Sequence, residues 1–402
     1  MDSIQESLFP ASDARTVPEE RTGSFTDNMK LPVHRWFRYS AGFSAEWAGS
    51  LIAAHKGELP VVLDPFAGSG TTLIEAEQHG ARAYGIEAHP FVARIAAAKL
   101  AYRSSREAFA THVLKVEDVA RGMMPNTEHY PELVRKCYTE DSLQKLDQIR
   151  RAYEFCKDGS ESTSLTWLAL VSILRAVSHV GTAPWQYVLP NKSKKKVLDP
   201  VVAFDLAARA IGEDMRVTES RDRHAPRASL IHGDARTCEG IPDDSVDLVV
   251  TSPPYANNYD YADATRLEMS FMGEVDSWSD LKDVVRQHLV RSCSQHVSER
   301  TVDLTAILNA PELLPIADEI QAVCRELGEV RLTKGGRKAY HLMVACYFHD
   351  MARLWTALRR VCRSGSKVCF VVGDSAPYGV NVPVMRWNGA LAKAARFREW
   401  SF

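Results

Sequence analysis

The chain has 402 residues, of which 45% are hydrophobic and 25% charged, a composition typical of a globular protein with one large domain or two ordinary ones. No apolar run approaches the roughly 20 residues that a membrane span requires, and the first residues lack the basic and apolar segments of a signal peptide. The formal net charge of −2 excludes attraction of nucleic acid to the whole surface, so any such surface must be local.

The eight cysteines are scattered along the chain and form no Cys-x-x-Cys pair. This spacing argues against a zinc module and for a reducing environment. We therefore expect a cytoplasmic protein with no bound metal and no membrane contact.

The first predicted element of the chain is a loose lead-in over residues 1–24, which are rich in Ser, Pro, Glu and Thr and show little periodicity. A helix is then predicted from Ala45 to His55, with Ser44 as its N-cap.

A regular alternation of strands and helices begins at Pro60. Residues 60–64 predict a short buried strand, residues 65–72 a glycine-containing turn, and residues 73–78 a helix. A second strand over 81–87 ends on an acid, and another helix is predicted over 91–100. Strand, glycine turn, helix, strand and acid form the first half of a nucleotide-binding βαβ unit.

From about residue 104 to 225 the strand signal disappears and helical periodicity takes its place. The predicted helices cover residues 108–121, 142–156, 165–180 and 202–217. We interpret this region as a helical insertion into the α/β core.

Strand character resumes at 228–234, and a further strand is predicted over 246–250. Residues 264–330 are again mostly helical. A long amphipathic helix over 340–362 leads into a buried strand at 367–373.

The glycine turn and the acids that end the strands indicate a binding site for S-adenosylmethionine. Gly68 and Gly70 let a ligand approach the backbone closely, and Glu87 suits a bidentate hydrogen bond to ribose hydroxyls. A carboxylate at Asp64 would repel a pyrophosphate but attract the ammonium of an amino-acid moiety, which disfavours NAD and ATP. Asp234 is either an acceptor for an adenine amine or a turn-forming residue.

The loop at 251–255 carries the catalytic chemistry, because two prolines stiffen it where a strand ends. An aromatic exocyclic amine is a weak nucleophile, since its lone pair is delocalised into the ring. The Ser252 hydroxyl and the Pro253 carbonyl are suited to accept its hydrogens and localise that lone pair for in-line methyl transfer. Tyr255 can stack on a base held outside its helix.

Two elements of the sequence, Phe-x-Gly-x-Gly at 66–70 and Ser-Pro-Pro-Tyr at 252–255, resemble the DNA amino-methyltransferases. Members of that family use S-adenosylmethionine to methylate cytosine N4 or adenine N6, and a serine in the first catalytic position is typical of the cytosine-N4 type. The resemblance implies a Rossmann-like α/β fold with a mostly parallel, seven-stranded type of sheet and helical insertions. It covers residues 25–103, 225–265 and 338–402, around half the chain.

The resemblance also implies roles for individual residues. Residues 34–44 look like the segment that lines the methionine pocket. The catalytic residues implied are Ser252, Pro253, Pro254 and Tyr255. The cofactor-binding residues implied are Phe37, Asp64, Phe66, Ala67, Gly68, Gly70, Thr71, Glu87, Asp234 and Thr251.

The chain departs from the family pattern in two respects. Its cofactor motif precedes the catalytic one, the reverse of the order commonest among cytosine-N4 members. The family sheet ends with a hairpin beyond the strand at 367–373, but only 29 residues follow Gly373. We therefore expect the sheet to be incomplete at its C-terminal edge, or completed by a partner.

Local basic and aromatic segments are candidates for contact with double-stranded DNA, although solvated loops would have the same composition. The candidate DNA-binding residues are Trp185, Lys192, Lys194, Lys195, Lys196, Asn257, Asn258, Tyr259, Lys334, Arg337 and Lys338. DNA binding would associate the protein with the nucleoid. The sequence does not indicate the recognition site, the oligomeric state, or whether a restriction endonuclease or partner subunit is paired with the chain.

These interpretations divide the chain into a lead-in, three core segments and two insertions. The lead-in is 1–24; the core segments are 25–103 with the cofactor motif, 225–265 with the catalytic loop, and 338–402. The insertions are 104–224, a candidate for target recognition, and 266–337, a candidate for DNA contact.

Other functions remain alternatives to a cytosine-N4 enzyme. The chain could be an adenine-N6 enzyme, an RNA or protein-glutamine methyltransferase, or a non-catalytic DNA-binding subunit with the same fold. A cytosine-C5 enzyme is excluded because it needs a Pro-Cys nucleophile, and none of the 19 prolines precedes a cysteine. An oxidoreductase that binds a dinucleotide is disfavoured by Asp64 and by the single βαβ half.

Overall fold

The structure is a computed structural model that describes residues 24–55, 58–182, 188–194, 196–219, 225–336 and 338–401. The expected lead-in therefore lies almost entirely outside the described residues. No helix in the described ranges combines the length and apolar character needed to cross a membrane.

The core of the fold is a five-stranded sheet in the order β5-β2-β1-β6-β7, with every neighbouring pair parallel. Its strands are β1 (Val62–Asp64), β2 (Ala83–Glu87), β5 (Ser229–His232), β6 (Val246–Thr251) and β7 (Cys362–Phe370). This arrangement confirms the Rossmann-like α/β fold. The strand order reverses between β1 and β6, which is where such sheets bind ligands, at the carboxyl ends of the strands.

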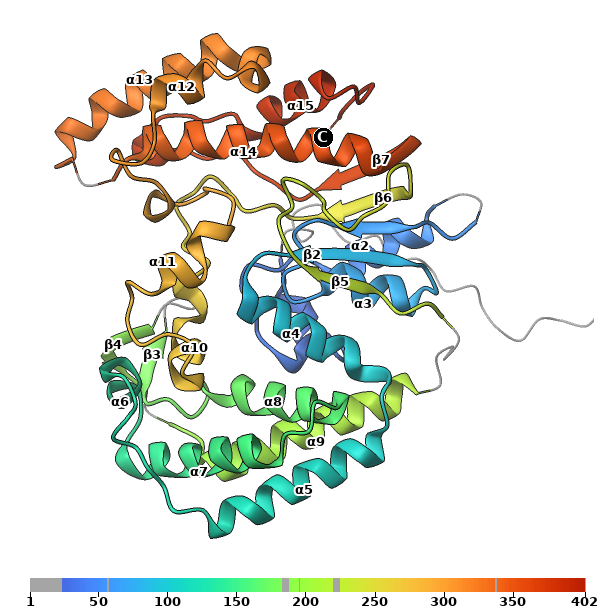
Figure 1. The fold of residues 1–402 in the computed structure, drawn as a ribbon, viewed down its shortest axis with the longest axis vertical. Helices are drawn as coiled ribbons and strands as arrows, with labels where there is room; N and C mark the ends of the chain where they lie inside the picture. Colours follow the sequence, from blue (N-terminus) through green and yellow to red (C-terminus); the bar gives the residue numbers. More distant parts are fainter. Residues whose placement is uncertain are drawn as a thin grey trace, which may run out of the picture.

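Helices cover both faces of the sheet because its strands alternate their side chains between two apolar cores. Leu248 and Val250 of β6 pack in one core with α2 (Ala45–Ala53), α3 (Thr71–Gln78) and α4 (Pro90–Leu100). Val249 packs in the other core with α14 (Tyr340–Val361). In Figure 1, α12 to α15 are grouped beyond one end of the sheet and α5, α7, α8 and α9 beyond the other.

The described residues of the predicted helical insertion form five helices and one short hairpin. Its helices are α5 (Arg106–Gly122), α6 (Glu132–Cys137), α7 (Glu140–Cys156), α8 (Glu161–Ile173) and α9 (Pro200–Thr218). Each of the four longer helices begins after a residue whose side chain accepts a hydrogen bond from a backbone N–H of the first turn. These N-caps are Ser105, Thr139, Ser160 and Asp199.

Two expectations about the insertion are wrong: one of its helices is shorter than predicted, and the insertion is not helical throughout. The helix expected over 165–180 ends at Ile173, and the chain then forms an antiparallel pair of strands, β3 (Val180–Thr182) and β4 (Val188–Ser193). β3 is too short to show an alternating pattern, and β4 contains a proline and several polar residues. A sequence pattern therefore could not identify this hairpin.

The segment after the catalytic loop is helical, as expected, but its first three helices are short. It contains α10 (Arg266–Met272), α11 (Leu281–Val284), α12 (Leu304–Leu308) and α13 (Ala317–Thr333), and α13 extends three residues beyond the helical region expected over 264–330. Short 3-10 helices occur at Thr26–Lys30, His34–Trp36, Ala101–Arg103, Asp263–Thr265, Arg286–His288, Ser294–His296, Pro311–Ile316 and Pro377–Gly379.

The C-terminal edge of the sheet lacks the hairpin of the seven-stranded type in the described part of the chain. After β7, Ser375 and Val382 form an isolated antiparallel bridge, and the chain continues into α15 (Val384–Ala394). β7 also begins at Cys362, directly after α14 and five residues earlier than predicted, because the sequence pattern gave no signal at its exposed first half.

Candidate active site

A pocket lies at the carboxyl ends of β1, β2, β5 and β6, and it brings both sequence motifs together. Residues predicted to bind the cofactor or to act in catalysis line this pocket beside residues that were not predicted. The predicted ones are Phe66, Ala67, Gly68, Thr71, Glu87, Asp234, Ser252 and Pro254. Those not predicted include Tyr39, His89, Tyr261, His288, Leu289 and Val290.

The glycine turn is shaped by Gly68, whose φ of +53° lies in the left-handed region. A Cβ at this position would lie 3.1 Å from Cε1 of Tyr39, so a side chain would crowd the pocket wall. Gly70 also has a positive φ, of +88°, but it does not line the pocket. A Cβ there would face Ala96 of α4, so Gly70 serves helix packing rather than ligand approach.

Glu87, at the end of β2, is held by two backbone N–H groups. Its Oε2 accepts a hydrogen bond from Gly68 N at 2.8 Å, and its Oε1 accepts one from His89 N at 2.7 Å. Burial raises the pKa of the Glu87 carboxyl to about 7. Each carboxylate oxygen keeps a further lone pair, so the ionised group can still accept two donors from a ligand in the pocket.

Asp64 does not lie where we predicted. Its side chain is 0% exposed and does not line the pocket, so it is not placed to face a ligand ammonium. It accepts hydrogen bonds from Phe66 N at 3.0 Å, from Thr72 Oγ1 at 2.8 Å and from Thr251 Oγ1 at 2.5 Å. Burial raises the pKa of Asp64 to about 6. Asp64 and Thr251 therefore lie behind the pocket and connect β1 to β6.

Phe37 also lies outside the pocket. Its buried side chain lines a smaller adjoining cavity, whereas Tyr39, two residues later, reaches both spaces. The segment that precedes the glycine turn thus contributes to the site through Tyr39. A period-2 pattern from Phe37 to Tyr39 could have indicated this, because alternate residues of an extended segment share a face.

The Ser-Pro-Pro-Tyr loop extends directly from β6. Ser252 Oγ donates a hydrogen bond to the carbonyl oxygen of Val371 at 3.1 Å, and Tyr255 N donates one to Tyr261 Oη at 3.3 Å. Ser252 and Pro254 line the pocket, while Pro253 is buried and Tyr255 is partly buried beside it. The loop is therefore fixed at both ends, with the Ser252 hydroxyl at the pocket wall.

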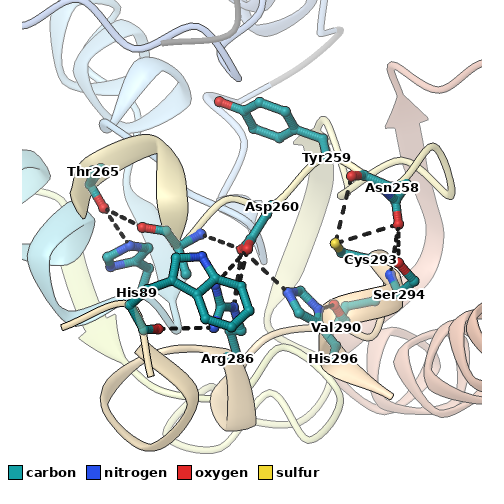
Figure 2. Close-up of polar contacts among 12 residues, drawn as sticks. His89, Asn258, Tyr259, Asp260, Thr265, Arg286, Val290, Cys293, Ser294 and His296 are labelled. Atoms are coloured by element: carbon teal, nitrogen blue, oxygen red, sulfur yellow. Dashed lines mark hydrogen bonds and ion pairs between the residues drawn. The ribbon is translucent and has the colours of Figure 1, made fainter. Parts of the chain in front are cut away.

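The polar loop after Tyr255 is anchored rather than free. Asn258 has a φ of +66°, and its Oδ1 accepts hydrogen bonds from Ser294 N at 2.9 Å and Ser294 Oγ at 2.6 Å. Asp260 accepts hydrogen bonds from Arg286 Nη2 at 2.7 Å and Nε at 3.1 Å. Figure 2 shows this anchor from Asn258 to Asp260, with the Tyr259 ring projecting from between them.

Asn258 is thus committed to a structural contact, whereas Tyr259 presents its ring beside Tyr261, which lines the pocket. Its Oη is 3.1 Å from Ser40 Oγ, next to Tyr39, and its ring meets the Tyr261 ring edge-on with centroids 4.6 Å apart. Asn257 is exposed, and its Oδ1 accepts a hydrogen bond from Tyr259 N.

His89 is a pocket residue that sequence reasoning missed. It is buried, its Nε2 is 2.9 Å from Thr265 Oγ1, and its Nδ1 is without a hydrogen-bond partner among the described residues. Burial lowers the pKa of His89 to about 3, so the ring is neutral. Its position two residues after the acid that ends β2 is the signal that could have identified it.

Asp234 is clamped by an arginine. Arg236 donates from Nε to both Asp234 carboxylate oxygens, at 2.8 and 2.9 Å, and its Nη1 lies 3.4 Å from Asp350 of α14. Asp350 also accepts hydrogen bonds from the backbone N and the guanidinium of Arg291. Asp350 therefore fixes Asp234 on one wall of the pocket and, through Arg291, the 288–290 segment on another.

The candidate DNA-binding cations that the structure describes do not line the pocket. Lys192, Lys196, Lys334 and Lys338 are exposed, and Lys338 lies 5.7 Å from the Tyr340 ring centre. Lys194 is half-buried and donates a hydrogen bond to the carbonyl oxygen of Arg175, so it differs from the exposed cation we expected. Trp185, Lys195 and Arg337 lie outside the described residues.

Comparison with known proteins finds similarity to DNA methyltransferases. A family model described as DNA methylase matches residues 7–98, a range that contains the glycine turn and Glu87. The Type II methyltransferase M.BsoBI of Geobacillus stearothermophilus is 26% identical, over 93% of this chain and 80% of its own length. M.AvaI of Nostoc sp. is 27% identical, over 90% and 78%. M.MvaI of Kocuria varians is 24% identical, over 65% and 60%.

No solved structure matches the chain. The relatives nevertheless extend far beyond the region of the family match, across nearly the whole chain. Together with the parallel sheet and with the two motifs at one pocket, these matches support the DNA methyltransferase family for this chain.

Proposed function

We propose that the protein transfers a methyl group from S-adenosylmethionine to the exocyclic N4 amine of a cytosine in double-stranded DNA. The observation that carries this proposal is that Gly68, Glu87 and Ser252 line one pocket at the carboxyl ends of the sheet strands. A role in restriction-modification is supported by the relatives, which are named Type II methyltransferases.

The cofactor would bind along the wall formed by β1, β2 and β5. The free lone pairs of Glu87 suit the two ribose hydroxyls, and Asp234, although clamped by Arg236, can still accept a hydrogen bond from the adenine amine. The turn at Gly68 lets the ligand approach the backbone. When bound, the cofactor supplies an electrophilic methyl group.

The target amine would lie against Ser252. The Ser252 hydroxyl donates its hydrogen bond to the carbonyl oxygen of Val371. The lone pairs of the Ser252 oxygen therefore remain available to accept an N–H of the amine. The Pro253 carbonyl is a second acceptor on the same loop. The two acceptors would localise the nitrogen lone pair and position it for in-line attack, with no covalent intermediate on the protein.

An extruded base needs an aromatic surface to replace the stacking it loses in the duplex. Tyr255, Tyr259 and Tyr261 lie on the loop that follows Ser252, and the Tyr259–Tyr261 pair presents ring surface next to it. Stacking is worth about 1–3 kcal/mol per base, comparable to the few kcal/mol that extrusion costs. This cluster supports base flipping as the route to the site.

The assignment to cytosine rests on Ser252, since serine at this position is typical of the cytosine-N4 members that the chain resembles. Adenine-N6 methylation is the alternative outcome, because the family of the matching model and the names of the relatives do not specify the base.

The proposal is tested by incubating the protein with duplex DNA and S-adenosylmethionine labelled with tritium in the methyl group. We expect tritium in the DNA, and we expect Ser252→Ala to lower turnover by about 100-fold while it leaves cofactor binding unchanged. Ser50→Ala is the matched control, because Ser50 also donates to a backbone carbonyl but lies on α2 outside the pocket. Equal loss of turnover and of cofactor binding would mean that Ser252 is structural.

A further inference from the structure

Lys99 is a buried cation that the proposed chemistry has not used. It lies in the last turn of α4, and its side chain is 1% exposed. Its Nζ donates one hydrogen bond, to the carbonyl oxygen of His34 at 2.9 Å. Within the described ranges, Lys99 forms no ion pair within 4 Å, although an ammonium group can donate three hydrogen bonds.

Lys99 lies beside a cavity that adjoins the candidate active site. Lys99 lines the small cavity next to the pocket, and the cavity and the pocket share four lining residues. These are Tyr39, Gly42, Ser69 and Thr71. Thr71 is the first residue of α3, so the positive N-terminal end of that helix faces the same space as the ammonium.

A buried ammonium without a counter-charge is costly, because the charge has lost its water and gained one neutral acceptor in return. Burial accordingly lowers the pKa of Lys99 to about 7. The Glu75 carboxylate pairs with the His34 ring at 2.8 Å and forms no ion pair with Lys99 among the described residues. An anionic ligand group in the small cavity would supply the missing partner.

We propose that Lys99 binds the carboxylate of the amino-acid end of the cofactor. This inference rests on the proposed function, because it takes S-adenosylmethionine as the ligand of the main pocket. The adenosine part would lie between Glu87 and Asp234, and the amino-acid part would extend past Ser69 and Thr71 toward Lys99. Asp64, which we expected to pair with the ammonium of the amino-acid end, is enclosed behind the pocket. Lys99 would therefore give the carboxylate of the cofactor, rather than its ammonium, a charged partner in the protein.

The test compares two ligands that differ only in this carboxylate: S-adenosylmethionine and decarboxylated S-adenosylmethionine. Dissociation constants are measured by titration calorimetry with the full chain and with three variants. Lys99→Met removes the charge but keeps the length of the side chain. Lys99→Gln is also neutral but keeps a donor for the His34 carbonyl. Lys115→Met is the control, because Lys115 is an exposed lysine of α5.

The unaltered protein is expected to bind S-adenosylmethionine at least about tenfold more tightly than the decarboxylated ligand, the range expected for a hydrogen bond to a charged group. Lys99→Met and Lys99→Gln should lose this preference while keeping the affinity for the decarboxylated ligand, and Lys115→Met should keep it.

Three results would overturn the inference. Equal affinity of the unaltered protein for both ligands would show that no group recognises the carboxylate, and the proposed function would stand. If Lys99→Gln bound both ligands more weakly by the same factor, Lys99 would have a structural role. If the unaltered protein bound neither ligand, the proposed function would fail and this inference with it.

Discussion

Thr251 Oγ1 donates a hydrogen bond to Asp64 Oδ1 at 2.5 Å, and this bond joins the ends of β6 and β1. The glycine turn follows Asp64 and the Ser-Pro-Pro-Tyr loop follows Thr251, so the bond fixes the cofactor half of the site against the catalytic half. Both side chains are 0% exposed, which keeps water from competing for the bond.

Replacing Thr251 with valine should therefore disturb both halves at once. Thr251→Val keeps the shape of the side chain but leaves Asp64 without one donor, which should lower the free energy of unfolding by about 1–3 kcal/mol and reduce kcat. Urea unfolding and single-turnover methyl transfer would measure the two effects. Thr305→Val on the exposed face of α12 is the control, and unchanged turnover in Thr251→Val would argue against coupling through this bond.

A side chain at Gly68 should abolish cofactor binding. Gly68→Leu would collide with Tyr39 and fill the pocket, since a Cβ alone comes within 3.1 Å of that ring. Gly335→Leu is a matched control, because Gly335 also has a positive φ, of +77°, but has open space around it. Titration calorimetry with S-adenosylmethionine should show loss of binding for Gly68→Leu alone. Retained binding would exclude the glycine turn from the cofactor site.

The buried carboxyl of Glu87 should make stability depend on pH. Its pKa is about 7 in the folded protein and 4.5 in its unperturbed state, because burial disfavours the charge. The folded state thus holds the proton more tightly than the unfolded state, so the stabilising contribution is complete below about pH 4.5 and is lost as pH rises through 7.

Between pH 5 and 7 the free energy of unfolding of the unaltered protein should fall more steeply than that of Glu87→Gln, by roughly 1–3 kcal/mol over the range. Urea unfolding at several pH values measures the difference between the two proteins, in which titrating groups that do not interact with Glu87 cancel. Parallel curves for the two proteins would mean that Glu87 is ionised throughout.

Asp350 should act as a positioning residue for the cofactor. It joins Arg236, which clamps Asp234, to Arg291, which anchors the 288–290 segment. Asp350→Asn should weaken cofactor binding more than it lowers the rate of a single saturated turnover, because Asp350 contacts no reacting group. Breaking this buried network should also cost about 3–5 kcal/mol of stability. A loss confined to the saturated rate would contradict the positioning role.

The sequence allowed the sheet and the long helices to be predicted, because their patterns are local and regular. Continuous apolar runs indicated β1 and β6, and a 22-residue amphipathic pattern indicated α14 almost to the residue. The β3–β4 hairpin could not be predicted, since neither strand carries a repeating pattern.

Motifs located the candidate site but could not determine which way each side chain points. Asp64 belongs to the glycine motif, yet it faces Thr72 and Thr251 inside the protein. Asn258 follows the catalytic loop, yet it accepts hydrogen bonds from Ser294. Lys99 reaches the site through the packing of residues distant in the sequence, and no local pattern of residues encodes that contact.

The base that receives the methyl group is the most direct test of the proposed function. Duplex DNA of mixed sequence is incubated with the protein and S-adenosylmethionine, digested to nucleosides and analysed by mass spectrometry, with Ser252→Ala in parallel. We predict N4-methylcytosine with the unaltered protein and almost none with Ser252→Ala. N6-methyladenine in place of N4-methylcytosine would contradict the cytosine assignment, and the absence of any methylated nucleoside would contradict the proposed activity.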